Sequence, residues 1–358
     1  MGEIYYLALI KLHQLKKRVT IHDIAKELNT TAATVSRALN NNPSIGIAMK
    51  QRVQEMAKKL NYRQDKIATS LRSGKTQVIG VIIPSAKISF FGSVVHGIES
   101  VARKRGYRIL LFQTNEKYTS EKEGINTLLQ SNVDAIIVSI SKETTNYDHF
   151  LEVKEQNIPL ILFDRTNDTL GFPSVVIDDF KGAYLATTHL IKQGYSNIAH
   201  ICGQQHIKIF EDRLLGYKSA LKDAGLPVKD ENIVMGDVSI QSGEEAAEKL
   251  LQLTNNPDAI FAAEDFMALG ALQTLKKHKL HQPGQFGLVG FANESFGQYI
   301  TPTLTTVDQR NIEMGEATAE LFFSLPSKDL YKEGQVAPKI TLEPELIIRE
   351  SSSRKSDK

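Results

Sequence analysis

Between Val19 and Asn42 the chain carries small polar residues at a spacing that suits a helix, a tight turn and a second helix. Thr20 and Asp23 form a capping-box pattern, which predicts where the first helix begins. Asn29 tolerates the left-handed conformation that ends a helix, a position more often filled by Gly. The apolar residues of this first helix lie along one stripe: Ile21, Ile24, Ala25 and Leu28.

The second helix has the composition needed to contact DNA bases. Thr31 is placed to cap it, and Val35 and Leu39 form its buried side. We expect the other side chains of its first turns to face outward: Ala32, Ala33, Thr34, Ser36 and Arg37. This is helix-turn-helix geometry, in which the first turn of the second helix enters a DNA major groove. The pattern alone also permits two amphipathic helices of an unrelated bundle.

Charge is divided unevenly along the chain, although the whole carries a formal net charge of only +2. Residues 1–75 hold 14 Lys and Arg against 5 Asp and Glu, a net charge of +9, and the remainder carries −7. A small basic segment on an acidic body indicates nucleic-acid contact confined to one end. A basic helix face can also serve solubility alone, but here the charge coincides with the helix-turn-helix pattern.

Length and composition exclude several classes of protein. The 358 residues leave room for a small head and one or two larger domains, and 41% hydrophobic content is typical of a folded protein. Cys202 is the single cysteine, so no disulfide framework exists, and the nine His show no metal-ligand spacing. We therefore expect neither a metal nor a cofactor.

Residues 1–18 form an N-terminal extension of unknown role. Its apolar run, 4–10, precedes its basic residues, which is the reverse of a secretory signal. No run in the chain approaches the length of a membrane span. The sequence therefore predicts a cytoplasmic protein that does not bind a membrane.

A third helix and a linker follow the helix-turn-helix. Apolar residues at helical spacing over 47–60 would close a three-helix head, which we place at 19–62. We assign 63–77 to a hinge helix and linker, in which 65–72 are helix-compatible but too short to hold a helix in water. This segment either folds on binding DNA or is a plain interdomain linker.

From 78 to 349 strand and helix patterns alternate, and 350–358 form a polar tail. The apolar runs indicate two series of buried strands: 78–83, 108–113, 135–140 and 160–164, then 175–178, 197–203, 232–237, 259–263 and 287–291. We therefore predict the α/β class, with an all-α N-terminal head and a two-lobed domain of parallel sheets flanked by helices. Small ligands bind between such lobes, at the carboxyl ends of the strands.

The order of these parts resembles the lactose/galactose repressor family of bacterial transcription regulators, over roughly residues 19–349. The motifs that carry the resemblance are VTIHDIA, TVSRALN, LNY, DR (164–165), RLLGY (213–217), EDFMALGAL (264–272), GLVGF (287–291) and PTLTTVDQ (302–309). The resemblance implies a homodimeric regulator of transcription, a repressor or an activator, of which we favour the repressor. Because each chain has a single helix-turn-helix, we expect the dimer to bind a palindromic operator. It also implies an effector domain similar to periplasmic sugar-binding proteins, whose small ligand changes operator affinity.

The resemblance further implies a set of DNA contacts. Base-reading positions fall on Ala32, Ala33 and Arg37, and Leu71 takes the position of a wedge that opens a base step in the minor groove. Contacts to the DNA backbone fall on Thr20, Thr31, Thr34, Ser36 and Asn40. The chemistry agrees, because Arg is the usual bidentate reader of guanine and an Ala methyl packs against a thymine methyl.

By the same resemblance, effector contacts fall on Ser85, Phe90 or Phe91, Asp164, Arg213, Glu264 and Gln309. Carboxylates and Arg suit the hydroxyls of a sugar or nucleoside, and an aromatic face suits its ring. Phe90 and Phe91 could equally be core packing, and Asp164 with Arg165 could be an ion pair alone. We expect Asp164 and Arg213, which opens a helix of the other lobe, to be bridged by the ligand.

The sequence departs from the family pattern in the turn of the helix-turn-helix, where Asn29-Thr30-Thr31 replaces Gly-Val-Ser, in the hinge and in the effector site. Gln64 and Asp65 replace Pro-Asn before the hinge helix, and Thr69 stands where Arg is frequent. In the effector site, Glu264 stands where Asn is typical and Ala292 where Asp is typical. The first of these two changes adds negative charge and the second removes it, so the sequence does not assign the ligand.

Two other classes of function share part of this pattern. The same α/β lobes would serve a solute-binding protein for import, but the basic helix-turn-helix and the missing signal peptide argue against it. An α/β enzyme would be expected to carry a G-x-G-x-x-G loop, a Walker loop or a nucleophile elbow, and none is present. We therefore expect no enzyme and no catalytic residues.

Overall fold

The computed structural model describes residues 19–62, 74–281, 283–326, 331 and 336–354. The chain divides into two compact units, 1–74 and 75–358, which we call the head and the body. No helix in these described residues is long and apolar enough to cross a membrane.

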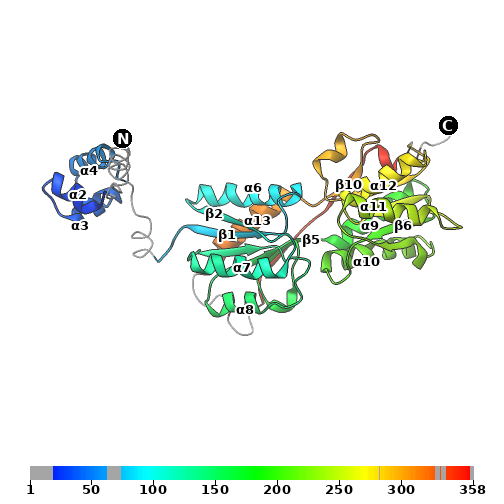
Figure 1. The fold of residues 1–358 in the computed structure, drawn as a ribbon, viewed down its shortest axis with the longest axis horizontal. Helices are drawn as coiled ribbons and strands as arrows, with labels where there is room; N and C mark the ends of the chain where they lie inside the picture. The colour runs from blue at the N-terminus through cyan, green and yellow to red at the C-terminus, as the bar shows by residue number, and fades with distance from the viewer. Residues whose placement is uncertain (1–18, 63–73, 282, 327–330, 332–335, 355–358) are drawn as a thin grey trace, which may run out of the picture. The chain divides into compact units, whose positions relative to one another are not determined.

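The head is a three-helix unit with its own small core. Its helices are α2 (Ile21–Glu27), α3 (Ala32–Leu39) and α4 (Ile47–Lys59) (Figure 1). The buried side chains of its core come from the three helices and the C-cap of α2: Ile24, Ala25, Leu28, Val35, Ala38 and Val53. Residues 1–18 and most of the predicted hinge, 63–73, lie outside the described residues.

The two predicted helix starts and the turn between them are confirmed. Asp23 Oδ2 accepts hydrogen bonds from the Thr20 backbone N–H and hydroxyl, both at 2.8 Å. Asn29 adopts a left-handed φ of 50°, as predicted for the residue that ends the first helix. The Thr31 hydroxyl then accepts the Thr34 N–H at 3.1 Å and caps α3.

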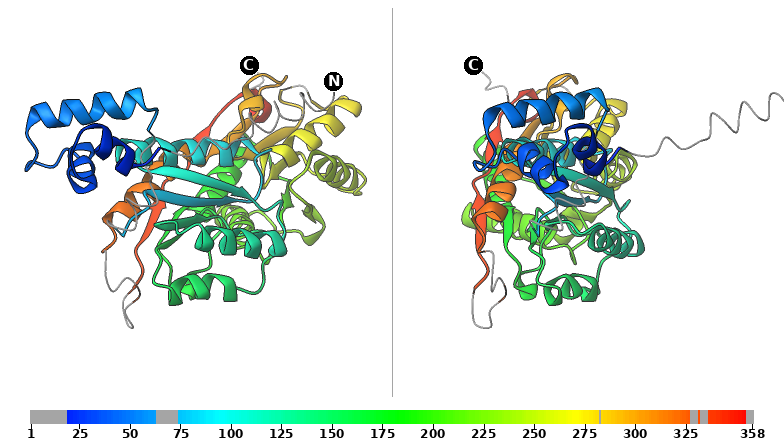
Figure 2. Two further views of the ribbon diagram at one scale, coloured as in Figure 1. Left: turned by 60° about the vertical axis from the view of Figure 1, so that its left-hand side comes forward. Right: turned by 90° about the vertical axis from the view of Figure 1, so that its left-hand side faces the viewer.

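The body contains two lobes, each a six-stranded sheet covered by helices on both faces (Figure 1). The first sheet has the order β11-β5-β4-β3-β1-β2, and all its strands are parallel. Its strands are β1 (Val78–Ile83), β2 (Arg108–Gln113), β3 (Ala135–Val138), β4 (Leu160–Phe163), β5 (Ser174–Ile177) and β11 (Lys339–Leu342). Helices α6 (Ser89–Lys104) and α13 (Asn311–Ser324) pack on one face, and α7 (Tyr118–Gln130) and α8 (Asp148–Glu155) on the other (Figure 2).

The second sheet has the order β12-β10-β9-β8-β6-β7, with β12 antiparallel at its edge. Its strands are β6 (Ile198–Cys202), β7 (Ile233–Met235), β8 (Ala259–Ala262), β9 (Gly287–Phe291), β10 (Thr305–Asp308) and β12 (Glu345–Ile347). Helices α9 (Asp179–Lys192) and α10 (Lys208–Asp223) cover one face, and α11 (Ile240–Leu251) and α12 (Asp265–Lys277) the other.

The chain passes between the two lobes three times, and this corrects the predicted assignment of strands to sheets. The run 175–178 was assigned to the second series, but β5 pairs with β4 and β11 in the first sheet. The chain crosses between lobes after β5, after β10 and after β11, so α13 belongs to the first lobe. Hydrophobic runs predict buried parallel strands without saying which sheet they join.

The polar tail predicted at 350–358 is wrong for its first residues. Ser351 and Ser352 are buried, at 3% and 0% exposure. Ser351 Oγ donates to the Leu288 carbonyl at 2.7 Å, and Ser352 Oγ lies 2.8 Å from His189 Nε2. These hydrogen bonds satisfy hydroxyls that composition alone makes look solvent-exposed.

Candidate functional site

The exposed side of α3 is the first candidate site. Ala33 and Arg37 are exposed, and Ala32 and Thr34 are partly buried. The side chain of Asn40 donates to the Ser36 carbonyl at 2.9 Å, at the C-terminal end of the helix.

Ser36 corrects the predicted outward face, because its side is buried at 8% exposure. At 3.6 residues per turn it lies about 100° from Val35 and about 60° from Leu39, on the edge of the buried arc. The DNA contacts proposed for Ser36 and its neighbours stay predictions, and Leu71 lies outside the described residues.

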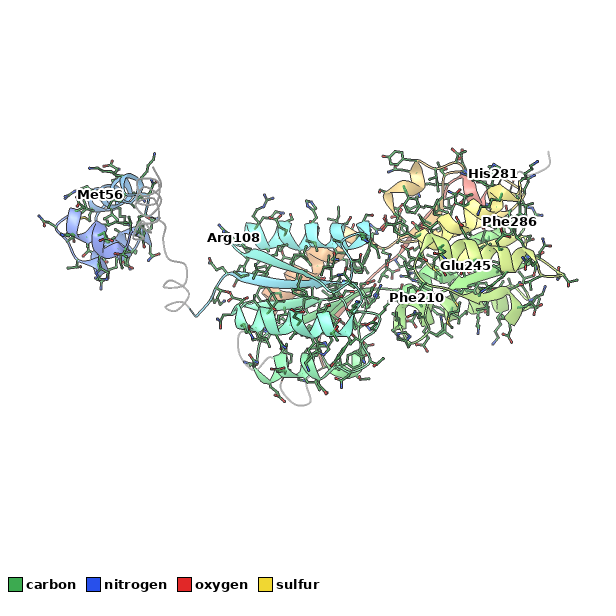
Figure 3. All side chains as sticks on the ribbon, viewed as in Figure 1. Met56, Arg108, Phe210, Glu245, His281 and Phe286 are labelled. Carbon is green, nitrogen blue, oxygen red and sulfur yellow. The ribbon has the colours of Figure 1, made fainter. Side chains whose placement is uncertain are left out.

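The second candidate site is a cleft between the lobes of the body. Its outer cavity has a volume of about 410 Å³, within the range of small-molecule sites. First-lobe residues in its wall include Ser85, Glu116 and Lys142, and second-lobe residues include Phe210 and Asp237. Figure 3 labels Phe210, which lies at the end of the second lobe that faces the first.

A smaller inner cavity of about 40 Å³ adjoins it, sharing Ile88, Arg165, Phe210 and Val238 with the outer one. It brings together six residues that the sequence predicted as effector contacts: Phe90, Phe91, Asp164, Arg213, Glu264 and Gln309. The seventh, Ser85, lies in the outer cavity instead. Within the described residues, no group of three or more His, Cys, Asp and Glu side chains could hold a metal ion.

The aromatic pair at the start of α6 serves packing and lining together. Phe90 and Phe91 are 4% and 2% exposed, and their rings meet edge to face with centroids 5.0 Å apart. Phe91 also meets Phe163 edge to face at 6.5 Å. Both rings are therefore core residues whose edges reach the inner cavity, rather than a free stacking platform.

The position of Arg213 in its helix differs from the prediction, while the ligand bridge to Asp164 stays a prediction. The residue does not open its helix, because α10 begins five residues earlier at Lys208. Its guanidinium pairs with Asp179 of its own lobe at 2.7 Å, donates to the Ala263 carbonyl at 2.6 Å and to Gln309 at 3.2 Å. The plane also lies 3.7 Å from the centroid of the Phe291 ring. Sequence reasoning missed Asp179, which lies 34 positions away.

The predicted ion pair of Asp164 with Arg165 is loose, at 3.9 Å. Arg165 makes a closer pair with Glu116 at 2.7 Å, which sequence reasoning also missed. Asp164 instead accepts a hydrogen bond from the Ser139 hydroxyl at 3.2 Å.

Burial dominates the electrostatics of the inner cleft. It raises the pKa of Asp164 and raises the pKa of Glu264 well above its usual range, where Asp265 adds like-charge repulsion. Burial also raises the pKa of Asp179 to about 7, although Arg213 opposes the rise. The pKa of Asp265 is likewise raised to about 7 by burial, against hydrogen bonds from Thr306 and the neighbouring backbone. Such carboxyl groups favour a partner that supplies positive charge or hydrogen-bond donors.

Backbone strain gathers around the same cavity. Asp164 and Ala292, which line the inner cavity, have φ values of 58° and 119°, both in the region that L-residues rarely occupy. They directly follow the strands β4 and β9, respectively. Non-Gly residues held in such conformations cluster at ligand clamps and switch regions.

Direct contacts hold the lobes together across the cleft. Lys142 Nζ lies 3.3 Å from Asp237 Oδ1, and the Lys142 carbonyl accepts a hydrogen bond from His206 Nε2 at 2.8 Å. On the other side, Glu294 accepts hydrogen bonds from the Ser89 hydroxyl and, at 3.2 Å, from the Phe90 N–H. These residues had no local signal in the sequence, because each pair joins positions that lie far apart.

Comparison with known proteins matches both units. Residues 20–65 match the family described as bacterial regulatory proteins, lacI family. Residues 76–335 match periplasmic binding proteins and the sugar-binding domain of the LacI family.

Individual relatives cover nearly the whole chain. Catabolite control protein A of Priestia megaterium is 35% identical over 312 residues, which are 87% of this chain and 93% of that protein. The transcriptional repressor PurR of Aliivibrio fischeri is 30% identical, covering 94% of this chain and 99% of that protein. The fold is similar to a lac repressor dimer bound to operator and the anti-inducer ONPF, with a TM-score of 0.83 at 22% identity, covering 94% of this chain and 100% of that chain.

Proposed function

The chain belongs to the lacI family of bacterial DNA-binding transcriptional regulators, and from this we propose a homodimeric repressor of a palindromic operator. Its operator affinity is set by a hydroxyl-rich small metabolite, a sugar or a related compound, bound between the two lobes of the body. The observation that carries the proposal is the joining of an exposed, correctly capped α3 to a body with a charged interlobe cavity in one chain.

On the DNA side, Arg37 reads a base and the polar side chains around it contact phosphates. Leu71 is the minor-groove wedge in this proposal. A single head makes too few contacts for operator-level affinity, so two heads related by a two-fold axis are required. Because the target is chromosomal DNA, we place the protein in the cytoplasm.

The exposed edge of the first sheet is a candidate surface for binding a second copy of the chain. Strand β2 is an edge strand, and its successive residues Leu110 and Leu111 are 45% and 50% exposed. On the second sheet, the edge strand β7 exposes Met235 at 62%. Exposed apolar residues on an edge strand are a ready surface for association.

Dimerisation is testable by placing charge on this edge. Replacing Leu110 and Leu111 together by Lys should give a folded monomer whose operator affinity falls by about 10²–10⁴, because the two heads no longer bind as one unit. Light scattering and fluorescence anisotropy on operator DNA measure the two effects. Leu151→Lys, at a 39% exposed position on α8, is the matched control and should remain a dimer.

On the ligand side, the cleft binds and releases its effector without turning it over. The effector must favour one arrangement of the lobes, since equal affinity for both would leave operator affinity unchanged. A thermal-shift screen with sugars, sugar phosphates and nucleosides should reveal it, because a ligand of the native state raises the unfolding temperature. Operator DNA is found by selecting binding sites from random duplexes. Selection of non-palindromic sites, or loss of the ligand during incubation, would contradict the proposal.

A further inference from the structure

The wall of the inner cavity combines apolar and charged residues. The apolar residues are Ile88, Phe90, Phe91, Ile209, Phe210, Val238 and Ala292. The charged residues are two acids and two bases, Asp164, Glu264, Arg165 and Arg213, and the amide of Gln309 lies with them in the wall. The formal charges of these four side chains cancel. The charge available to a ligand therefore depends on which of them already have partners.

Both arginines are neutralised from outside the cavity. Arg213 is paired at 2.7 Å with Asp179, and Arg165 is paired at 2.7 Å with Glu116. Neither Asp179 nor Glu116 lines the inner cavity. The positive charge of the cavity wall is therefore already compensated, and little of it remains for the two acids.

The two acids of the wall have weak partners by comparison. Asp164 and Glu264 are each 6% exposed. Asp164 accepts the Ser139 hydroxyl at 3.2 Å and meets Arg165 Nε at 3.9 Å, beyond hydrogen-bond distance. Glu264 accepts the Phe266 N–H at 2.6 Å, and among the described residues no Lys, Arg or His pairs with it.

One buried N–H group of this wall lacks a hydrogen-bond acceptor. Arg165 Nε is buried and makes no hydrogen bond within the described residues, although its Nη1 is bound to Glu116. A guanidinium N–H can only donate, so it calls for an acceptor such as a hydroxyl oxygen. The wall thus offers two carboxylates that need positive charge, beside one donor that needs an oxygen.

We propose that the effector is an amino sugar, or a closely related amino polyol, whose ammonium group lies between Asp164 and Glu264 and whose adjacent hydroxyl oxygen accepts from Arg165 Nε. An ammonium has three N–H donors and one positive charge, which two buried carboxylates require. A neutral sugar would satisfy the hydrogen bonds but bring no cation, so both carboxyl groups would stay in the protonated form that burial favours. This inference rests on the proposed function and names the class of its ligand.

The raised pKa values of the two carboxyl groups agree with this assignment. In the ligand-free cleft they favour the protonated form, and a bound cation lowers their pKa again. Binding of an amine should therefore release protons, which calorimetry in buffers of different ionisation enthalpy detects. Binding of a neutral sugar should release none.

The test is calorimetry with matched pairs: glucosamine and glucose, galactosamine and galactose, mannosamine and mannose. We expect at least one amine to bind about tenfold or more tightly than its parent sugar, a gain typical of one added charged contact. Glu264→Gln should remove this preference while keeping the acceptor that caps α12. Glu248→Gln, on α11 outside the cavity, is the matched control and should keep it.

Three results would overturn the proposal: parent sugars that bind as tightly as their amines, amines that all fail to bind at millimolar concentration, or an amine preference unchanged in Glu264→Gln. Asp164→Asn provides a second variant if Glu264→Gln does not fold. Ligand-free operator binding is measured on the same samples. If it persists when the amines fail, the amine assignment alone is wrong, whereas its loss in the wild type would contradict the proposed function itself.

Discussion

The exposed side of α3 in the head and the cleft of the body are built in opposite ways. In the head, the caps and hydrogen bonds that shape α3 join residues no more than five positions apart, and Arg37 is left exposed. In the cleft, Arg213 is 2% exposed and is held by residues 34 and 96 positions away. The head therefore leaves its proposed DNA-contacting groups exposed, whereas the cleft pairs its arginines with internal partners.

This difference has a consequence for mutation. A side chain that is exposed and locally supported can be removed with little loss of stability, so its loss is felt in binding. A buried charge cannot be removed without stranding its partner, so its loss is felt first in folding. Mutations in the head should therefore affect binding, and mutations of buried charges in the cleft should first affect stability.

The largest effect should come from removing the head altogether. Deleting residues 1–75 should abolish operator binding, because the basic segment and α3 are lost, while the body keeps its fold and its ligand. Anisotropy measures the first property and thermal shift the second. A body that unfolds or loses its ligand on this deletion would show that the two regions are not separable.

Arg213→Ala should lower the free energy of unfolding by about 3–5 kcal/mol, since Asp179 would be left buried without its partner. Urea unfolding measures the change. Replacing the pair together, Arg213→Met with Asp179→Leu, should recover most of the lost stability while still abolishing the ligand response. If Arg213→Ala instead folds normally and merely loses its ligand, Arg213 acts as a bridge between lobes, as the sequence suggested.

The same pair gives the cleft a pH dependence with a definite sign. Because the pKa of Asp179 is raised to about 7, the native state keeps a proton that the unfolded state has lost above about pH 4. The contribution of Asp179 to stability therefore falls as pH rises from about 4 to about 7. The destabilisation of Arg213→Ala should accordingly be smaller near pH 5 than near pH 8.

These predictions also mark what sequence could and could not supply. Thr20, Asn29 and Thr31 were predictable because caps and turns depend on neighbours within a few positions. The six residues of the inner cavity were found only through resemblance to a family, which carries long-range information that periodicity lacks. Asp179 and Glu116 escaped notice because neither has a local motif, and only the fold brings each to its arginine.

The sequence predicted the class of the fold but not the path of the chain between the two sheets. Alternating apolar runs identified a parallel α/β body, yet β5 was assigned to the wrong sheet, and β10, α13, β11 and β12 were not predicted. Thr305 to Asp308 carries only one strongly apolar residue, so it gave little strand signal. The prediction of a solvent-exposed tail was wrong at Ser351 and Ser352 for a different reason. Their hydroxyls form buried hydrogen bonds, which composition alone does not reveal.

A smaller effect is expected on the DNA side. Arg37→Ala should weaken binding to the best operator by about 1–3 kcal/mol and relax preference at one base pair in each half-site, with the head still folded. Arg52→Ala, an exposed arginine on α4, is the control and should not change sequence preference. Equal losses on operator and random DNA for Arg37→Ala would make it a phosphate contact only.

The smallest effect should come from the ion pair that spans the mouth of the cleft. Lys142 and Asp237 are 33% and 55% exposed, so their 3.3 Å contact should contribute at most about 1 kcal/mol. Asp237→Asn should then weaken effector binding by about fivefold or less, because the closed arrangement of the lobes loses one contact. Calorimetry at low and high salt measures this, and the difference from wild type should shrink at high salt because partly exposed charges are screened. Lys122→Ala, at an exposed position on α7, is the matched control and should leave affinity unchanged at either salt. A salt-independent loss for Asp237→Asn would mean that Asp237 contacts the ligand itself, and the cleft would then hold one more acid for a cationic effector.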